Sequence, residues 1–132
     1  MSRHIVWIED DSYIIGSVVR PLEERGYKIQ VIENMRDALE KVEDLRQCDL
    51  ILLDIILSAG DKEREGERHV GLTILKHLRD QSVTTPVLAF TVVQNQGTRE
   101  ALRALGVADI LDKPILPSVL EKKVLEVLGE EE

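Results

Sequence analysis

The chain has 132 residues and a formal net charge of −8, which allows one domain with a single sizeable core. The acidic balance argues against direct binding to nucleic acid, which needs a basic surface, and it suits a protein that attracts cations or a basic partner. The single cysteine, Cys48, excludes an internal disulfide, and no apolar run approaches the roughly 18 residues of a membrane span, so we expect a cytoplasmic protein without membrane contact.

Short apolar runs alternate with amphipathic segments of helix length along the whole sequence. The runs that predict strands are residues 4–8, 28–32, 50–53, 87–91 and 109–111. Helices are predicted from about residue 11 to Gly26 and over residues 34–46, 70–79, 98–105 and 117–128. Five strand–helix pairs in strict alternation predict an α/β fold with a parallel sheet covered on both faces. We therefore expect one domain over residues 1–132, with a charged loop inserted at about 58–69.

Four local features refine this outline. Asn34 is placed to cap the second helix, and residues 50–53 are apolar on both faces, which is typical of a central buried strand. Pro21 lies inside the first helix, where it removes a backbone donor and should kink the helix. The acidic tail, Glu130–Glu132, is expected to be frayed and solvated.

Polar residues stand where the predicted strands end, and ligands of open parallel sheets bind beyond the carboxyl ends of the strands. The residues at those ends are Glu9, Asp10, Asp11, Asp54, Thr91 and Lys113. Carboxylates that converge repel one another and need a cation, and Mg²⁺, which prefers oxygen ligands, suits such a cluster. An aspartate beside a metal and an ammonium can attack a phosphoryl group, because both cations neutralise the charge on its oxygens.

Each of these signals is weak when taken alone. Acidic residues commonly cap helix N-termini, a role that Asp11 can fill here, leaving two acids for the metal. Thr91 is an ordinary strand residue, and Lys113 followed by Pro114 is an ordinary turn signal. Asp54 is stronger, because a carboxylate directly after four buried apolar residues is more often functional than structural. The coincidence of all four at strand ends is what indicates a phosphorylation site.

Four stretches carry a family resemblance, namely IVWIEDD (5–11), LILLD (50–54), PVLAFT (86–91) and LDKP (111–114). In order and spacing they resemble the receiver domain of two-component response regulators, and the similarity covers nearly the whole chain. The resemblance implies a flavodoxin-like (βα)5 doubly wound sheet with strand order 2-1-3-4-5.

The resemblance also implies a role for each site residue. Glu9 and Asp10 match the acidic pair that binds the metal. Asp54 matches the phosphoacceptor, which is itself a metal ligand, and the backbone carbonyl of Ile56 completes the set. The expected cofactor is Mg²⁺, with Mn²⁺ able to substitute.

Two further residues match the groups that contact the phosphoryl oxygens. Thr91 matches the switch hydroxyl that bonds the phosphoryl group. Lys113 matches the lysine that pairs with it, so the bond from Lys113 to Pro114 is expected to be cis. The resemblance implies phosphorylation by a histidine kinase or a phosphotransfer protein, and control of an unknown output partner. It implies a monomer or weak homodimer that catalyses only its own modification, and so is not a metabolic enzyme.

Four departures from the family pattern remove no group that phosphorylation needs, and they concern how the domain would signal to a partner. Ser58 stands where the family usually has proline, Val92 where it has alanine or glycine, and Ile110 where it has an aromatic switch residue. The loop from Asp54 to Gly71 is also longer than usual and dense in mixed charge. The alternative is therefore a pseudo-receiver that only binds proteins.

Two other classes fit less well. A flavodoxin-like cofactor carrier would need a loop rich in Gly, Ser or Thr after the first strand. An aspartyl phosphatase would need a second acid two residues after Asp54, where this chain has Ile56.

Overall fold

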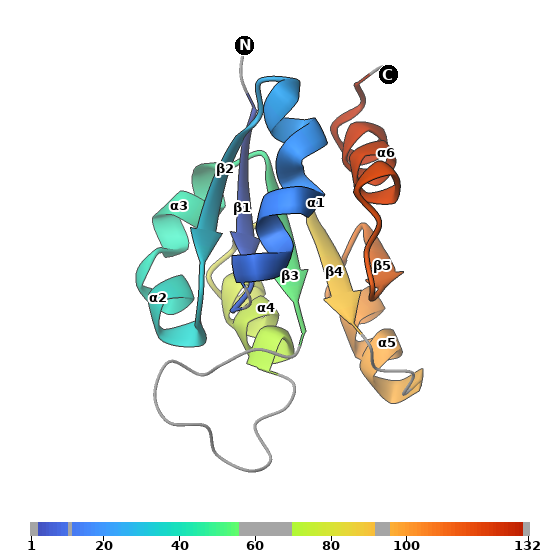
Figure 1. Cartoon of the computed structure of the whole chain (residues 1–132). Coiled ribbons are helices and arrows are strands. Elements are labelled where there is room, and N and C mark those ends of the chain that lie inside the picture. The colour runs from blue at the N-terminus through green and yellow to red at the C-terminus, as the bar shows by residue number, and fades with distance from the viewer. Residues whose placement is uncertain (1–2, 11, 56–69, 92–95, 131–132) are drawn as a thin grey trace.

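The computed structural model describes residues 3–10, 12–55, 70–91 and 96–130. Its centre is a parallel five-stranded sheet in the order β2-β1-β3-β4-β5 (Figure 1), as the resemblance implied. The strands are β1 (His4–Ile8), β2 (Lys28–Ile32), β3 (Leu50–Asp54), β4 (Val87–Thr91) and β5 (Asp109–Asp112). The helices are α1 (Ser12–Glu24), α2 (Met35–Glu40), α3 (Val42–Gln47), α4 (Val70–Asp80), α5 (Gln96–Ala104) and α6 (Pro117–Leu128).

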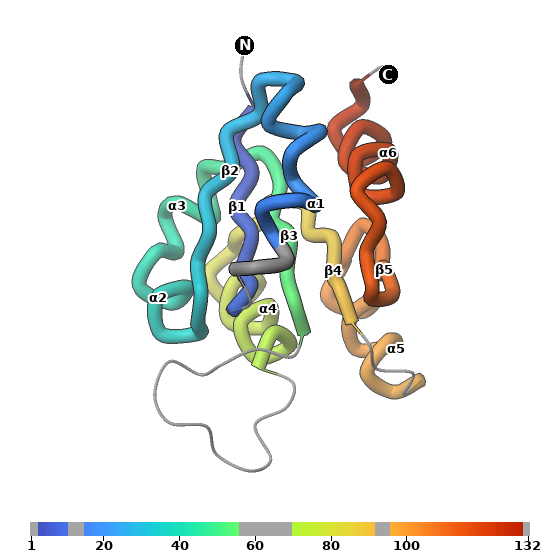
Figure 2. Tube along the Cα trace, viewed as in Figure 1, coloured from blue at the N-terminus to red at the C-terminus, as the bar shows by residue number. Residues whose placement is uncertain are grey.

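The sheet separates two apolar cores, because side chains alternate between its faces. In β3, Ile51 and Leu53 face one core, whereas Leu50 and Leu52 face the other. The first core is covered by α2 to α5 and the second by α1 and α6, which lie side by side (Figure 2). The predicted doubly wound architecture is confirmed. None of the helices in these described ranges combines the length and the apolar character that crossing a membrane requires.

The helix predicted over residues 34–46 is two helices, so this prediction is wrong in one respect. Asn34 caps α2 as expected, since its side chain accepts a hydrogen bond of 2.9 Å from the Asp37 N–H. At Lys41 the backbone leaves the helical region (φ −107°, ψ 33°), and α3 begins at the next residue. Ala38 of α2 and Leu45 of α3 both lie in the core, as they would on one continuous helix, since seven residues make close to two turns. Lys41 is neither glycine nor proline, so no local signal marks the break. Pro21, in contrast, does not end α1.

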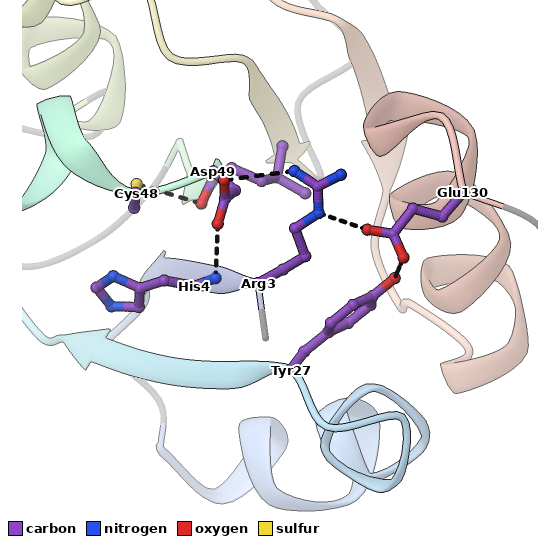
Figure 3. Close-up of polar contacts among 7 residues, drawn as sticks. Arg3, His4, Tyr27, Cys48, Asp49 and Glu130 are labelled. Carbon is purple, nitrogen blue, oxygen red and sulfur yellow. Dashed lines mark hydrogen bonds and ion pairs between the residues drawn. The ribbon is translucent and has the colours of Figure 1, made fainter. Parts of the chain in front are cut away.

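The expected frayed tail is wrong for Glu130 (Figure 3). Its carboxylate accepts hydrogen bonds from Arg3 Nε at 2.6 Å and from the Tyr27 hydroxyl at 2.7 Å. Arg3 also lies 3.6 Å from Asp49, which in turn accepts a hydrogen bond from the backbone N–H of His4. Burial and the bond to Glu130 raise the pKa of Tyr27 to about 12. These contacts join the two ends of the chain at the amino end of the sheet.

Candidate functional site

Strand register brings the predicted site residues to one end of the sheet. Ile8 of β1 pairs with Leu53 of β3, so the residues that follow them, Glu9 and Asp54, are neighbours. On the other side of β3, Asp54 pairs with Phe90 of β4, and Thr91 follows directly. These residues are far apart in sequence, and the parallel pairing of their strands brings them together at one end of the sheet.

The acidic cluster forms as predicted. One carboxylate oxygen from each of Glu9, Asp10 and Asp54 lies within 4.8 Å of the others. Glu9 and Asp54 are buried, whereas Asp10 is exposed at the mouth of the cluster. Three carboxylate oxygens so close together, two of them shielded from water, fit a hard divalent cation that keeps part of its hydration shell.

Lys113 reaches into this cluster from the residue that follows β5. Its Nζ lies 2.8 Å from Asp54 Oδ2 and 3.2 Å from Glu9 Oε1. Its backbone N–H donates a hydrogen bond of 3.0 Å to the carbonyl oxygen of Thr91. The peptide bond to Pro114 is cis, as predicted. The ammonium therefore contributes one positive charge to the two buried carboxylates.

The pKa shifts follow from this crowding. Burial, followed by the hydrogen bond and the negative charge of Asp54, raises the pKa of Glu9, and the nearby ammonium only partly opposes this. Burial acts to lower the pKa of Lys113, but its hydrogen bonds and charge pairing with Asp54 and Glu9 outweigh burial and raise it. The ammonium thus stays charged beside Glu9, whose raised pKa shows that its charged form is disfavoured, and added positive charge is favoured here.

Gly71 supports the backbone of Asp54, a role that sequence reasoning missed. It lies in the first turn of α4, and its N–H donates a hydrogen bond of 2.9 Å to the carbonyl of Ile55. A Cβ added to Gly71 would stand 2.3 Å from the carbonyl oxygen of Asp54 and 2.7 Å from Cα of Ile55. No side chain fits there, so glycine allows α4 to press against the end of β3. A glycine near a helix start was the available signal, and it is a weak one.

Thr91 is buried at the carboxyl end of β4, one residue beyond the partner of Asp54. Ile110 lies in β5 and packs against the core that α5 covers. Other sequence predictions lie outside the described residues. These concern the capping role of Asp11, the Ile56 carbonyl, Ser58, Val92, the inserted loop 58–69, and Glu131 and Glu132 of the acidic tail.

Comparison with known proteins identifies the family. The model of the response regulator receiver domain matches residues 5–125. The alkaline phosphatase synthesis transcriptional regulatory protein PhoP of Bacillus subtilis is 27% identical over 132 residues, which is 100% of this chain and 51% of PhoP. The transcriptional regulatory protein CiaR of Streptococcus pneumoniae is 29% identical over 94% of this chain and 50% of CiaR. The chain thus spans about half the length of these curated relatives.

Solved structures share the fold. A two-component response regulator from Clostridium difficile has a TM-score of 0.79 at 29% identity, with 96% of each chain covered. The chemotaxis response regulator CheY4 of Vibrio cholerae has a TM-score of 0.78 at 25% identity, over 97% of this chain and 100% of CheY4. With a family match over most of its length, the chain belongs to the response regulator receiver domain family of two-component systems.

Proposed function

We propose that this receiver domain accepts a phosphoryl group on Asp54 in a reaction that depends on Mg²⁺. The observation that carries the proposal is the contact of Lys113 with a buried Asp54, inside a cluster completed by Glu9 and Asp10. If Asp54 had only a structural role, the single positive charge of Lys113 would balance it and no further acids would be needed nearby. The two additional carboxylates make sense if a divalent cation joins them.

Glu9, Asp10 and Asp54 are the proposed metal ligands, with the Ile56 carbonyl as a fourth suggested by the family resemblance. The donor set is all oxygen, which suits Mg²⁺ or Mn²⁺ rather than a metal that prefers nitrogen or sulfur. When bound, the cation supplies positive charge that offsets the charge of the phosphoryl oxygens.

The residues of the chain would carry the transfer itself. A carboxylate oxygen of Asp54 forms a bond to phosphorus as the P–N bond of a donor phosphohistidine breaks, and the imidazole nitrogen leaves with the electron pair and takes a proton from water. Lys113 Nζ, already 2.8 Å from Asp54 Oδ2, can bond an oxygen of the incoming group. The hydroxyl of Thr91 would donate to another phosphoryl oxygen. Burial of the site strengthens both interactions.

Residues 1–132 would form one receiver domain, with a histidine kinase or a phosphotransfer protein as phosphodonor. The relatives named above are transcriptional regulators about twice as long. Their length supports the proposal that this domain controls an output partner or a fused output domain. The acidic surface disfavours direct nucleic-acid binding by the domain itself. We propose a cytoplasmic monomer or weak homodimer that catalyses only its own modification.

Intact mass after incubation with acetyl phosphate tests the proposal. The wild type should gain one phosphoryl group with Mg²⁺ present and none after chelation with EDTA. Asp54→Asn should gain none, whereas Asp80→Asn, which changes an exposed carboxylate at the end of α4, should behave as wild type. If the wild type gains no mass but still binds a partner, the chain is a pseudo-receiver.

A further inference from the structure

An ion pair outside the acidic cluster joins α5 to the last residue of β5. Arg99 Nη2 in the first turn of α5 bonds to Asp112 Oδ1. The Arg99 side chain is only 15% exposed, whereas that of Asp112 is 60% exposed. Covering most of a guanidinium costs free energy that a strong partner must offset, so this contact differs from an ordinary surface pair.

The position of Asp112 gives the pair its importance. Asp112 immediately precedes Lys113 and forms the last rung of the sheet, opposite Thr91. Among the described strands β5 is at the edge of the sheet, bonded to β4, so the end of β5 takes its strand pairing in this part of the chain from a single neighbour. Nζ of Lys113 must nevertheless be held within hydrogen-bonding distance of Asp54.

Strand geometry shows how α5 supplies the missing support. Ile110 and Asp112 are two residues apart in β5, so their side chains point to the same face. Ile110 packs against the core that includes Leu102 of α5, so this is the face that α5 covers. Asp112 therefore extends past the end of the core toward the first turn of α5, where Arg99 bonds to it.

We infer that Arg99 and Asp112 are positioning residues for the proposed phosphorylation, because their ion pair fixes the end of β5 and hence the ammonium of Lys113 against Asp54. Neither residue would touch the phosphoryl group. The inference rests on the proposed function, and it assigns to α5 a direct mechanical connection with the lysine of the site.

The chain offers a matched control in the ion pair of 2.6 Å between Arg25 Nε, in the turn that follows α1, and Glu121 Oε2 of α6. Like Asp112, Glu121 pairs with an arginine from a distant part of the sequence. Glu121→Gln and Asp112→Asn each remove one negative charge and one ion pair. Only the second variant alters the support of Lys113.

The experiment measures the rate constant of phosphorylation by acetyl phosphate and the dissociation constant of Mg²⁺ for wild type, Asp112→Asn, Arg99→Met and Glu121→Gln. Asp112→Asn and Arg99→Met should slow phosphorylation about tenfold, since a misplacement of about 1 Å can cost up to about a hundredfold. Their Mg²⁺ affinity should not fall, because Lys113 is not a metal ligand. Glu121→Gln should match the wild type in both measurements. The charge-reversed double variant Arg99→Asp with Asp112→Arg should recover most of the rate.

The outcomes separate the two proposals. If the wild type is phosphorylated and Asp112→Asn reacts as fast as Glu121→Gln, the positioning role is wrong and the proposed function stands. A loss of rate that comes with an equal loss of Mg²⁺ affinity would also overturn the positioning role, because it would indicate general damage to the site. A wild type that gains no phosphoryl group overturns the proposed function, and this inference with it.

Discussion

The two ends of the sheet carry the same arrangement of charge in different surroundings. At the amino end, Arg3 bridges Asp49 and Glu130, and the three side chains are 41%, 36% and 30% exposed. At the carboxyl end, Lys113 bridges Glu9 and Asp54, and the three side chains are 20%, 1% and 3% exposed, in that order.

Burial is what gives one of these ends its chemistry. Water screens the amino-end charges, which therefore hold chain segments together at little cost. At the carboxyl end water is largely excluded, and Asp10 adds a third carboxylate at the mouth of the cluster. The repulsion among these carboxylates is therefore strong, and binding a cation there relieves it.

Removing the central cation from each end should produce the largest difference. Lys113→Met leaves two buried carboxylates without their partner and should lower the free energy of unfolding by about 3 kcal/mol in the absence of Mg²⁺. Arg3→Met should cause a much smaller loss, because its partners are solvated. Urea unfolding in EDTA measures both. Equal losses of unfolding free energy in the two variants would contradict the claim that burial makes the carboxyl-end charges interact more strongly.

The backbone under Asp54 should be nearly as sensitive. Gly71→Ala places a methyl group against the carbonyl of Asp54, so α4 or the end of β3 must move, and we expect a loss of about 2 kcal/mol. Gly16→Ala is the matched control. Apart from the backbone of α1 itself, no atom of the described residues lies within 4 Å of a Cβ added at Gly16, so this change should stabilise the protein by about 0.5–1 kcal/mol. A neutral Gly71→Ala would show that α4 does not press on the site.

Repulsion among the acids should be visible in the metal-free protein. Asp10→Asn removes one of three crowded carboxylates and should raise the melting temperature in EDTA by about 3 °C. Mg²⁺ should raise the melting temperature of the wild type and have little effect on this variant. Asp80→Asn should keep the Mg²⁺ response. An unchanged melting temperature for Asp10→Asn in EDTA would mean that these acids do not repel one another.

The smallest effect concerns pH at the amino end. The hydrogen bond from Tyr27, followed by that from Arg3, lowers the pKa of Glu130. A carboxyl group with a lowered pKa in the folded state contributes stability above its usual pKa of 4.5, and this contribution is lost as the pH falls through the lowered value. Glu130→Gln should therefore melt slightly below wild type at pH 7, and the two curves should converge as the pH falls below 4.5. Parallel curves would contradict the assigned bonds.

Features that depend on local pattern could be predicted from the sequence. The alternation of apolar runs and amphipathic segments indicated each strand found in the described residues, and Asn34 marked the start of α2 as expected. The site could be predicted because parallel pairing carries strand-end residues to a common edge, whatever fills the rest of the fold.

Features that depend on distant partners could not be predicted. Glu130 is ordered by Arg3 and Tyr27, more than a hundred residues away in sequence. Glycine is needed at position 71 because the backbone of Asp54 and Ile55 lies against it in the folded protein. The break at Lys41 falls at a residue that is neither glycine nor proline, so the local sequence does not mark it. Burial, which distinguishes the two charged ends, is likewise a property of the assembled fold.

The most direct test of the central claim is to locate the modified residue. Treating the protein with acetyl phosphate and Mg²⁺, then with borohydride, converts an aspartyl phosphate to homoserine, which peptide mass spectrometry can place in the sequence. We predict homoserine at position 54 and at no other aspartate, with none formed in EDTA. Homoserine at Asp10 or elsewhere, or at position 54 without any metal requirement, would contradict the account.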